Sequence, residues 1–176
     1  DDTPRIDYTD GGCPVLLTEP QSTNLITNSN DFSTSDWAKA DADVVSNFGI
    51  SPSGNFDASN WVSIGGSYPQ ISQVIYGLTI GEDYSFSFYV KSDGTNQIIQ
   101  SAWFTGFAAT TFTPTNEWTR VTNTITATAT SHKVLIFTNS PTASASSFLI
   151  YGAQVEELSY ATSLIPTYGA VRTRLQ

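Results

Sequence analysis

The sequence predicts an all-β protein that folds as a two-sheet antiparallel β-sandwich, a jelly roll. Two observations support this prediction. Short segments in which apolar residues alternate with Ser or Thr recur along the 176-residue chain, and Gly, Pro, Asn and Asp separate them, as expected for strands joined by turns. Helical periodicity is almost absent, so the strands have no helical spacers between them, which is typical of a sandwich.

The first elements lie in and after a polar segment. Residues 1–20 are expected to form a lead-in that packs on or precedes the module, and its one apolar stretch is Val15-Leu16-Leu17. The sandwich module is expected over residues 21–158 and a lead-out over residues 159–176. Strands in the first third of the chain are predicted around residues 15–18, 24–28, 41–46 and 60–64.

The central strands have the clearest pattern. A strand over residues 68–76 would place Ile71, Gln73 and Ile75 on one face. Residues 84–91 alternate most strictly, with Tyr84, Phe86, Phe88 and Val90 on one face and Ser85, Ser87, Tyr89 and Lys91 on the other. We expect the first set to lie in the core and the second on a sparse polar face. The remaining strands are predicted at residues 97–104, 117–127, 132–139 and 147–155.

The composition favours binding over catalysis. The chain has four Trp and eight Tyr, but one His, one Cys and seven Lys+Arg. Aromatic rings with hydroxyl and amide neighbours suit a flat neutral ligand such as a sugar ring, and they transfer protons poorly. The low charged content of 13% and the abundance of Ser and Thr are typical of a secreted, extracellular β-protein.

Charge and hydropathy exclude two classes of partner. The net charge is −9, so the chain lacks the Lys and Arg clusters that bind nucleic acid or anionic lipid. No apolar run approaches the roughly 18 residues that a membrane span needs. The chain starts at Asp1 without an initiator Met, which suggests a module taken from a longer polypeptide.

Catalytic chemistry has few candidate residues. Cys13 cannot form a disulfide within the chain, and His132 is the only histidine that could activate it or serve a lyase. Hydrolysis of a glycosidic bond needs two carboxyl groups at a defined separation. Most acidic residues here lie in turns or near the ends, and Glu156 and Glu157 are adjacent on one strand, so their side chains should point to opposite faces. A zinc site is excluded because His and Cys do not cluster.

Three separated segments carry a recognisable pattern. The first opens with Asn24-Leu25-Ile26-Thr27-Asn28 and continues through Phe32 to Trp37. The second runs from Gln73 to Lys91. The third combines Glu117-Trp118-Thr119-Arg120-Val121 with residues 148–156. In order and spacing these segments resemble the jelly-roll carbohydrate-binding modules grouped as families four, nine, sixteen and twenty-two. Residues 4–21 and 160–169 also resemble a variant seen in marine bacterial polysaccharide-degrading enzymes and in phage tail-fibre-like proteins.

The resemblance implies a sugar-binding role and a structural calcium ion. In the family, the loop after the opening strand often carries a sugar-stacking Trp, which points to Trp37. The family's closing strand carries an Asp pair that helps to hold calcium, but this chain has Tyr151-Gly152 there. Asp31 and Asp57 are the remaining candidates for a structural Ca²⁺ site, together with backbone carbonyls.

The predicted sugar site combines aromatic rings, amides and one cation. Aromatic rings would stack on the C–H faces of the sugar, amides would bind its hydroxyls, and Lys91 or Arg120 could bind a sulfate or carboxylate. Phe86, Phe88 and Trp118 are assigned to packing. The candidate carbohydrate-binding residues are Trp37, Trp61, Gln73, Tyr89, Lys91, Gln100 and Trp103.

The sequence therefore predicts a non-catalytic, monomeric carbohydrate-binding module. Its partners would be a polysaccharide of marine or algal origin and a catalytic domain on the same parent polypeptide. The alternative is a structural or adhesive jelly-roll domain of a phage tail fibre or cell-surface adhesin, in which oligomer contacts bury the aromatic residues. A polysaccharide lyase is the third and least favoured function, because no motif supports it.

Overall fold

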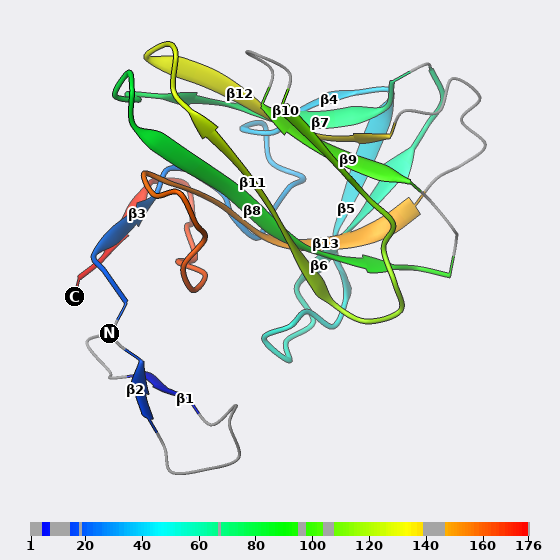
Figure 1. The fold of residues 1–176 in the computed structure, drawn as a ribbon. Helices are drawn as coiled ribbons and strands as arrows, with labels where there is room; N and C mark the ends of the chain where they lie inside the picture. Colours follow the sequence, from blue (N-terminus) through cyan, green and yellow to red (C-terminus); the bar gives the residue numbers. More distant parts are fainter. Residues whose placement is uncertain are drawn as a thin grey trace.

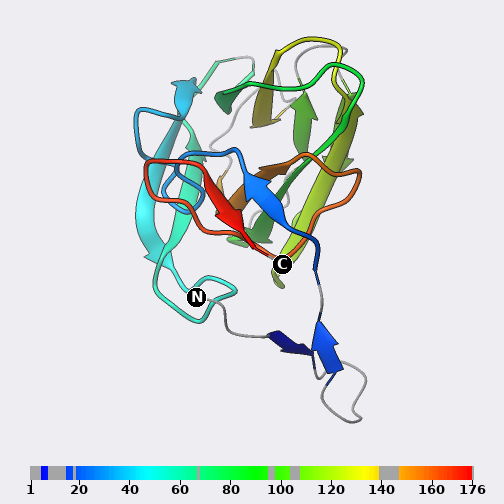
Figure 2. The same cartoon turned by 90° about the vertical axis from the view of Figure 1, so that its left-hand side faces the viewer.

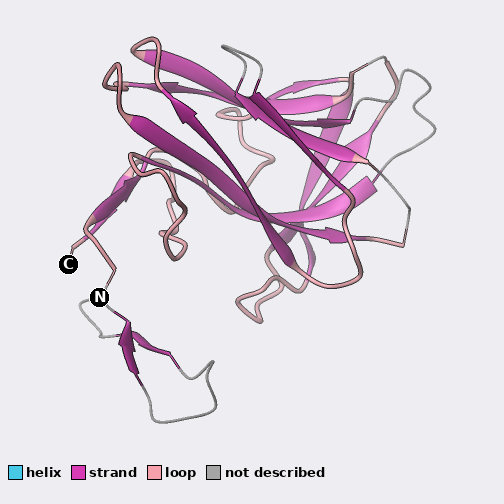
Figure 3. Cartoon of the chain, viewed as in Figure 1, coloured by secondary structure: helices cyan, strands magenta, loops and turns pink. Residues whose placement is uncertain are grey.

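The structure is a computed structural model that describes residues 5–7, 15–17, 19–66, 68–94, 98–103, 108–138 and 147–175. These residues form strands and loops, and none of them forms a helix (Figure 3). None of the described segments is therefore a helix long and apolar enough to cross a membrane. Cys13 and the expected strand end at residue 104 lie outside the described residues.

Two five-stranded antiparallel sheets pack face to face and confirm the predicted β-sandwich (Figure 1). Sheet I has the order β10 (Ala108–Phe112), β9 (Ile99–Trp103), β12 (Ser131–Thr138), β7 (Gln70–Tyr76) and β4 (Ala38–Ala40). Sheet II has the order β11 (Thr119–Thr126), β8 (Asp83–Ser92), β13 (Ser147–Glu156), β6 (Ala58–Ser63) and β5 (Ala42–Gly49). Each sheet therefore has one face toward the core and one outer face.

Two short antiparallel pairs complete the described strands. β1 (Arg5–Asp7) pairs with β2 (Val15–Leu17), and Figure 1 shows this hairpin outside the two large sheets. β3 (Ser22–Asn24) pairs with β14 (Arg172–Arg174), so segments from opposite ends of the chain lie side by side (Figure 2).

The core forms where the sequence alternates most strictly. Tyr84, Phe86, Phe88 and Val90 of β8 point between the sheets and are fully buried, as predicted from the alternation over residues 84–91. Their burial removes apolar surface from water, which is the main favourable term in folding. The opposite residues of β8 therefore line the outer face of sheet II.

The chain differs from the prediction over residues 24–28, of which only Asn24 belongs to a strand, β3. β3 ends at Asn24, whose Oδ1 accepts a hydrogen bond from the Ile26 N–H at 3.0 Å and turns the backbone. Only Asn28 pairs further along, in an isolated bridge with Tyr168. Strands β4, β10 and β14 were not predicted, because their short Ala-, Thr- and Arg-rich sequences lack apolar alternation.

A bulge in β13 shapes the outer face of sheet II. The register with β8 shifts between Tyr151 and Gln154, and Gly152 has a φ of +64°. A Cβ atom at this position would lie 2.7 Å from Cδ2 of Leu164, so a side chain here would collide with it. Gly152 therefore lets the segment that contains Leu164 lie directly against the sheet.

Candidate functional site

The three tryptophans predicted to bind sugar lie in the core, so that assignment is wrong. Trp37, Trp61 and Trp103 expose 1%, 0% and 0% of their surface. A ring that is not exposed cannot stack on a ligand. A large apolar ring between two sheets instead contributes to the stability of the sandwich.

Each buried indole is held by its neighbours. The Trp61 ring stacks on Phe148, with ring centroids 4.6 Å apart. Trp103 meets Phe86 edge-on, and its Nε1 donates to the carbonyl of Asn123 at 3.2 Å. The Trp103 contacts join sheet I to sheet II, whereas the Trp61–Phe148 stack lies within sheet II.

Trp37 packs in the same way. Its ring centroid lies 4.9 Å from that of Phe32, and its Nε1 donates to the carbonyl of Asn28 at 2.9 Å. The residue thus closes the core beneath the loop that follows β3. The resemblance implied that Trp37 projects from that loop toward a sugar, and the structure does not show this.

The side chain of Gln73 also forms its hydrogen bonds inside the protein. Its Oε1 accepts a hydrogen bond from the Thr27 N–H at 3.3 Å, and its Nε2 donates to Thr27 Oγ1 and to the carbonyl of Asp36, each at 3.4 Å. The side chain is buried on the core face of β7. Its predicted role in sugar binding is therefore wrong, and it serves to anchor the loop between β3 and β4.

The remaining predicted residues lie on two opposite outer faces. Tyr89 and Lys91 belong to the outer face of sheet II, because they alternate with core residues of β8. Gln100 belongs to the outer face of sheet I, because Ile99 and Ser101 on either side of it are buried. The predicted set therefore does not form one site. Each face has to be judged separately.

On sheet II, a hollow of about 580 Å³ opens beside Tyr89. Arg120, which pairs with Tyr89 in the strand register, and Tyr151, which pairs with it on the other side, form its floor. Its rim consists of Glu19, Pro52, Ser53, Ala161, Thr162, Ser163, Leu164 and Pro166.

The chain after β13 covers the part of this face that β8 and β13 form. Gln154 Nε2 donates to the carbonyls of Thr162 and Ser163 at 3.3 and 3.2 Å. Ser85 Oγ donates to the carbonyl of Tyr160 at 3.0 Å. Residues 160–163 therefore lie across the outer face of β8 and β13, and the hollow lies at the end near Tyr89.

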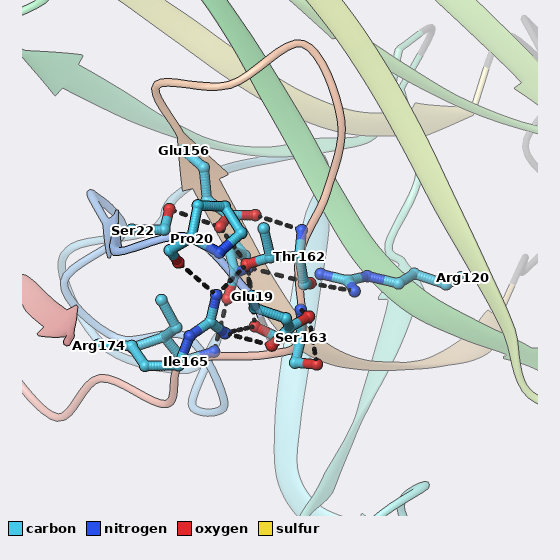
Figure 4. A network of polar contacts seen from close by, with 10 residues as sticks. Glu19, Pro20, Ser22, Arg120, Glu156, Thr162, Ser163, Ile165 and Arg174 are labelled. Carbon is cyan, nitrogen blue, oxygen red and sulfur yellow. Dashed lines mark hydrogen bonds and ion pairs between the residues drawn. The ribbon is translucent and has the colours of Figure 1, made fainter. Parts of the chain in front are cut away.

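A buried polar network holds this covering segment (Figure 4). Glu156 is fully buried; its carboxylate accepts hydrogen bonds from Ser22 Oγ at 2.6 Å and from the Thr162 N–H at 2.9 Å, and also from Thr162 Oγ1. Arg174 pairs with Glu19 at 2.9 Å. The network thus joins both ends of the chain to the covering segment.

The outer face of sheet I has a different character. The strand register aligns four residues in one row across β7, β12, β9 and β10, namely Gln70, Phe137, Gln100 and Thr111. Gln100 Nε2 donates to Thr111 Oγ1 at 3.0 Å. Tyr68, two residues before β7, is 57% exposed, and Tyr76 at the far end of the strand is 74% exposed. Phe137 is buried in a small cluster with Ala102 and Leu135 on this face, so the row offers a ligand its two half-buried amides and the exposed Thr111 hydroxyl.

One partly exposed tryptophan was assigned to packing. Trp118 precedes β11 and is half-buried, and its Nε1 donates to the carbonyl of Ile50 at 3.1 Å. Tyr68 was not among the predicted site residues either. Both were expected within strands, over residues 68–76 and 117–127, but β7 begins at Gln70 and β11 at Thr119, so the alternation of these strands does not determine their exposure.

Glu156 and Glu157 have separate surroundings and do not form a carboxyl pair. Glu156 is buried in its network, whereas Glu157 is exposed and accepts a hydrogen bond from the Tyr84 hydroxyl at 2.7 Å, as predicted for side chains on opposite faces. His132 is buried, and its Nε2 accepts from the Thr128 N–H at 3.2 Å. It is thus enclosed among core residues.

The two predicted calcium ligands differ in their surroundings. Asp31 Oδ1 accepts hydrogen bonds from the Ser33 N–H, Ser33 Oγ and Ser46 Oγ. Burial opposes ionisation, but these hydrogen bonds and Lys39 hold the pKa of Asp31 below its usual value. Asp57 Oδ1 is buried and has no hydrogen-bond partner. Among the described residues, no three His, Cys, Asp or Glu side chains form a metal-binding cluster.

Comparison with solved structures identifies the fold. TmCBM61, solved in complex with β-1,4-galactotriose, has a TM-score of 0.53 and 15% identity over 75% of this chain and 97% of its own. The fold is that of the jelly-roll carbohydrate-binding modules. The Clostridium thermocellum Xyn10B CBM22-1–GH10 structure, complexed with xylohexaose, has a TM-score of 0.52 and 14% identity over 84% of this chain and 30% of its own.

A third similar structure is the enzymatically active domain of tailspike protein 4 from bacteriophage CBA120. It has a TM-score of 0.51 and 13% identity, and the match covers 75% of this chain but only 21% of the tailspike chain. This chain therefore spans about a fifth of the solved tailspike chain. No protein-family model and no curated protein sequence matches the chain. At these identities the likeness establishes the fold.

Proposed function

We propose that this chain is a non-catalytic carbohydrate-binding module whose ligand lies along the outer face of sheet I. The observation that carries the proposal is the row in which the amides of Gln70 and Gln100 lie on either side of the buried Phe137, with the exposed Thr111 at its end. Amide groups both donate and accept hydrogen bonds, which suits sugar hydroxyls. Exposed Tyr68 beside the row offers an aromatic face for the C–H side of a sugar ring.

The geometry favours an oligosaccharide over a single sugar. Four neighbouring strands carry the row, and with strands about 4.8 Å apart it extends over about 14 Å. The described outward-facing residues of sheet I include no carboxyl group, whereas cleavage of a glycosidic bond needs two. A net charge of −9 disfavours long-range attraction of polyanions, so we propose a neutral glycan for this face.

Gln100→Ala and Gln70→Ala are expected to weaken binding of a neutral oligosaccharide by about tenfold each, because each removes hydrogen bonds worth about 1 kcal/mol or more. Isothermal titration against neutral algal and plant oligosaccharides measures the loss. Tyr89→Ala, on the opposite sheet, is the control and should bind normally. If no neutral glycan binds the folded wild type, or if only the control loses binding, the site is not on sheet I.

The setting of the module is part of the proposal. TmCBM61 and the CBM22-1 module of Xyn10B are similar to this chain in fold, and the Xyn10B structure also contains a GH10 module. We propose that this chain likewise acts beside a catalytic domain of a secreted protein and brings it to a polysaccharide, marine or algal in origin. As an isolated module it would be monomeric.

The tailspike likeness supports a second candidate function, a structural jelly-roll domain of a phage tail fibre or adhesin. Exposed Phe48, Ile50 and Phe56 near the edge strand β5 provide apolar surface that an oligomer would bury. Light scattering after size exclusion separates the two functions. A stable trimer would favour the fibre domain, and a monomer that binds glycan favours the module.

A structural calcium ion is proposed at Asp57 alone. A buried carboxylate oxygen without a donor is costly unless a cation or proton neutralises it, and a hard cation prefers such oxygens. We expect millimolar Ca²⁺ to raise the melting temperature of the apo protein, and Asp57→Asn to abolish the rise. Asp31→Asn should retain it, because Asp31 Oδ1 is already taken by N–H and O–H donors. An unchanged wild-type melting temperature would exclude the ion.

A further inference from the structure

We propose that the hollow on the outer face of sheet II is a second binding site, for a sugar residue that carries an anionic group. The anionic group is a carboxylate or a sulfate ester, since both present oxygen acceptors to a guanidinium. This site lies on the opposite side of the sandwich from the row of Gln70 and Gln100, and it differs from that row in charge. The two sites can therefore be tested separately.

Arg120 supplies the charge. It is partly buried on the floor of the hollow, and it donates to Ser87 Oγ at 2.9 Å and to the carbonyl of Thr162. Both partners are neutral, and no described carboxylate forms an ion pair with it. Its Nε is buried without a hydrogen-bond partner. A partly buried cation with only neutral partners is incompletely compensated, and a ligand anion would supply the missing charge.

The acidic residue on the rim does not cancel this charge. Glu19 forms an ion pair with Arg174 at 2.9 Å, and its Oε1 accepts hydrogen bonds from the Ser163 N–H and Ser163 Oγ, each at 2.7 Å. Its negative charge is therefore already matched. Lys91, on the same face of β8 two residues beyond Tyr89, adds a second positive charge nearby. The hollow is thus locally cationic on a chain whose net charge is −9.

The walls favour a sugar over a simple inorganic anion. The half-buried ring of Tyr89 lies under the Arg120 guanidinium, whose Cζ is 5.4 Å from the ring centroid. The ring centroid of Tyr151 is 6.4 Å from that of Tyr89. Pro52, Leu164 and Pro166 add apolar surface at the rim. A pyranose ring offers apolar C–H groups to such walls, whereas a free sulfate offers none. A volume of about 580 Å³ accommodates a sugar ring with its substituent.

The site is also held in shape before a ligand arrives. The segment that forms one wall is fixed by Glu156, which binds Thr162, and by Gln154, which binds the carbonyl groups of Thr162 and Ser163. Gly152 allows Leu164 to approach the sheet. A preformed wall reduces the ordering cost of binding, so even a single sugar residue can be recognised.

The test is a titration of the full chain with three small probes, followed by NMR or calorimetry. Methyl β-D-glucuronide carries a carboxylate, glucose 6-sulfate carries a sulfate ester, and methyl β-D-glucoside is the neutral match. We expect at least one charged probe to bind about tenfold or more tighter than the neutral one. The charged probe that binds identifies the anionic group. Raising NaCl from about 0.05 M to about 0.5 M should weaken that binding about threefold or more.

Variants locate the binding and keep the outcome clear. Arg120→Lys keeps the charge but loses the guanidinium fork, so we expect about a tenfold loss. Because Arg120 also binds Thr162, a second variant, Ala161→Trp, fills the hollow from its rim without removing a hydrogen bond and should abolish binding. Gln100→Ala should bind the charged probe normally. Equal binding of all three probes, or unchanged binding by Ala161→Trp, would overturn the proposal, whereas loss in Gln100→Ala alone would place the ligand on sheet I.

Discussion

Replacing Trp61 with alanine is expected to lower the free energy of unfolding by about 3–5 kcal/mol, the range for a large ring removed from a packed core. Trp61 is fully buried and stacks on Phe148 across the β6–β13 pair. The cavity would lie between the sheets, where the neighbouring strands cannot close around it. Chemical denaturation followed by circular dichroism measures the change.

Two variants show that burial causes the effect. Trp61→Phe keeps an aromatic ring against Phe148 and should cost clearly less. Trp118→Ala removes the half-buried tryptophan near Ile50 and should cost about 1 kcal/mol or less. Similar losses for Trp61→Ala and Trp118→Ala would contradict the placement of the tryptophans described here.

Asn24→Ala is expected to destabilise the protein by about 3 kcal/mol, because it leaves several buried polar groups without partners. Asn24 Nδ2 donates to the carbonyls of Ala153 and Ile165 at 3.1 and 2.9 Å. Its Oδ1 accepts from the Ile26 and Val155 N–H groups at 3.0 and 3.1 Å. One side chain thus joins the chain after β3, the bulge of β13 and the covering segment.

Thr23→Ala is the matched control for Asn24→Ala. Thr23 is the neighbouring residue of β3, and its hydroxyl bonds to Thr173 Oγ1 at 2.7 Å in an exposed position. Water can replace that bond, so the expected loss is about 0.5 kcal/mol. Thermal and urea unfolding of both variants measure the difference. If the two losses are equal, the buried network around Asn24 does not stabilise the fold.

The strand pattern was predictable where alternation is strict. Residues 84–91 have an apolar residue at every second position, and such a period of two indicates a β-strand with one buried face. The position of the tryptophans was not predictable, because an indole suits both a core and a sugar-binding surface. Trp103 illustrates the problem, since its face was correctly grouped with Ile99 but assigned in part to a ligand.

The candidate sites depend on contacts between distant parts of the chain. Ser22 and Glu156, or Glu19 and Ser163, are more than 130 residues apart in sequence. No local pattern indicates that they meet, so the covering segment and the shape of the hollow could not be predicted. Tyr89 and Arg120 were predicted separately, and only the register of β8 with β11 places them side by side.

The pairing of β3 with β14 determines how the module would respond to mechanical force. The strands are antiparallel with Arg174 opposite Ser22, so a pull on residues 20 and 175 acts on the same end of the pair. Such a load opens the hydrogen bonds one after another, beginning at the Arg174–Ser22 pair and the Glu19–Arg174 ion pair. Unzipping would then strain the segment that walls the hollow, and also Glu156 of β13, whose carboxylate accepts a hydrogen bond from Ser22 Oγ. Tension on the chain ends is therefore expected to change the sheet II hollow while the sandwich stays folded.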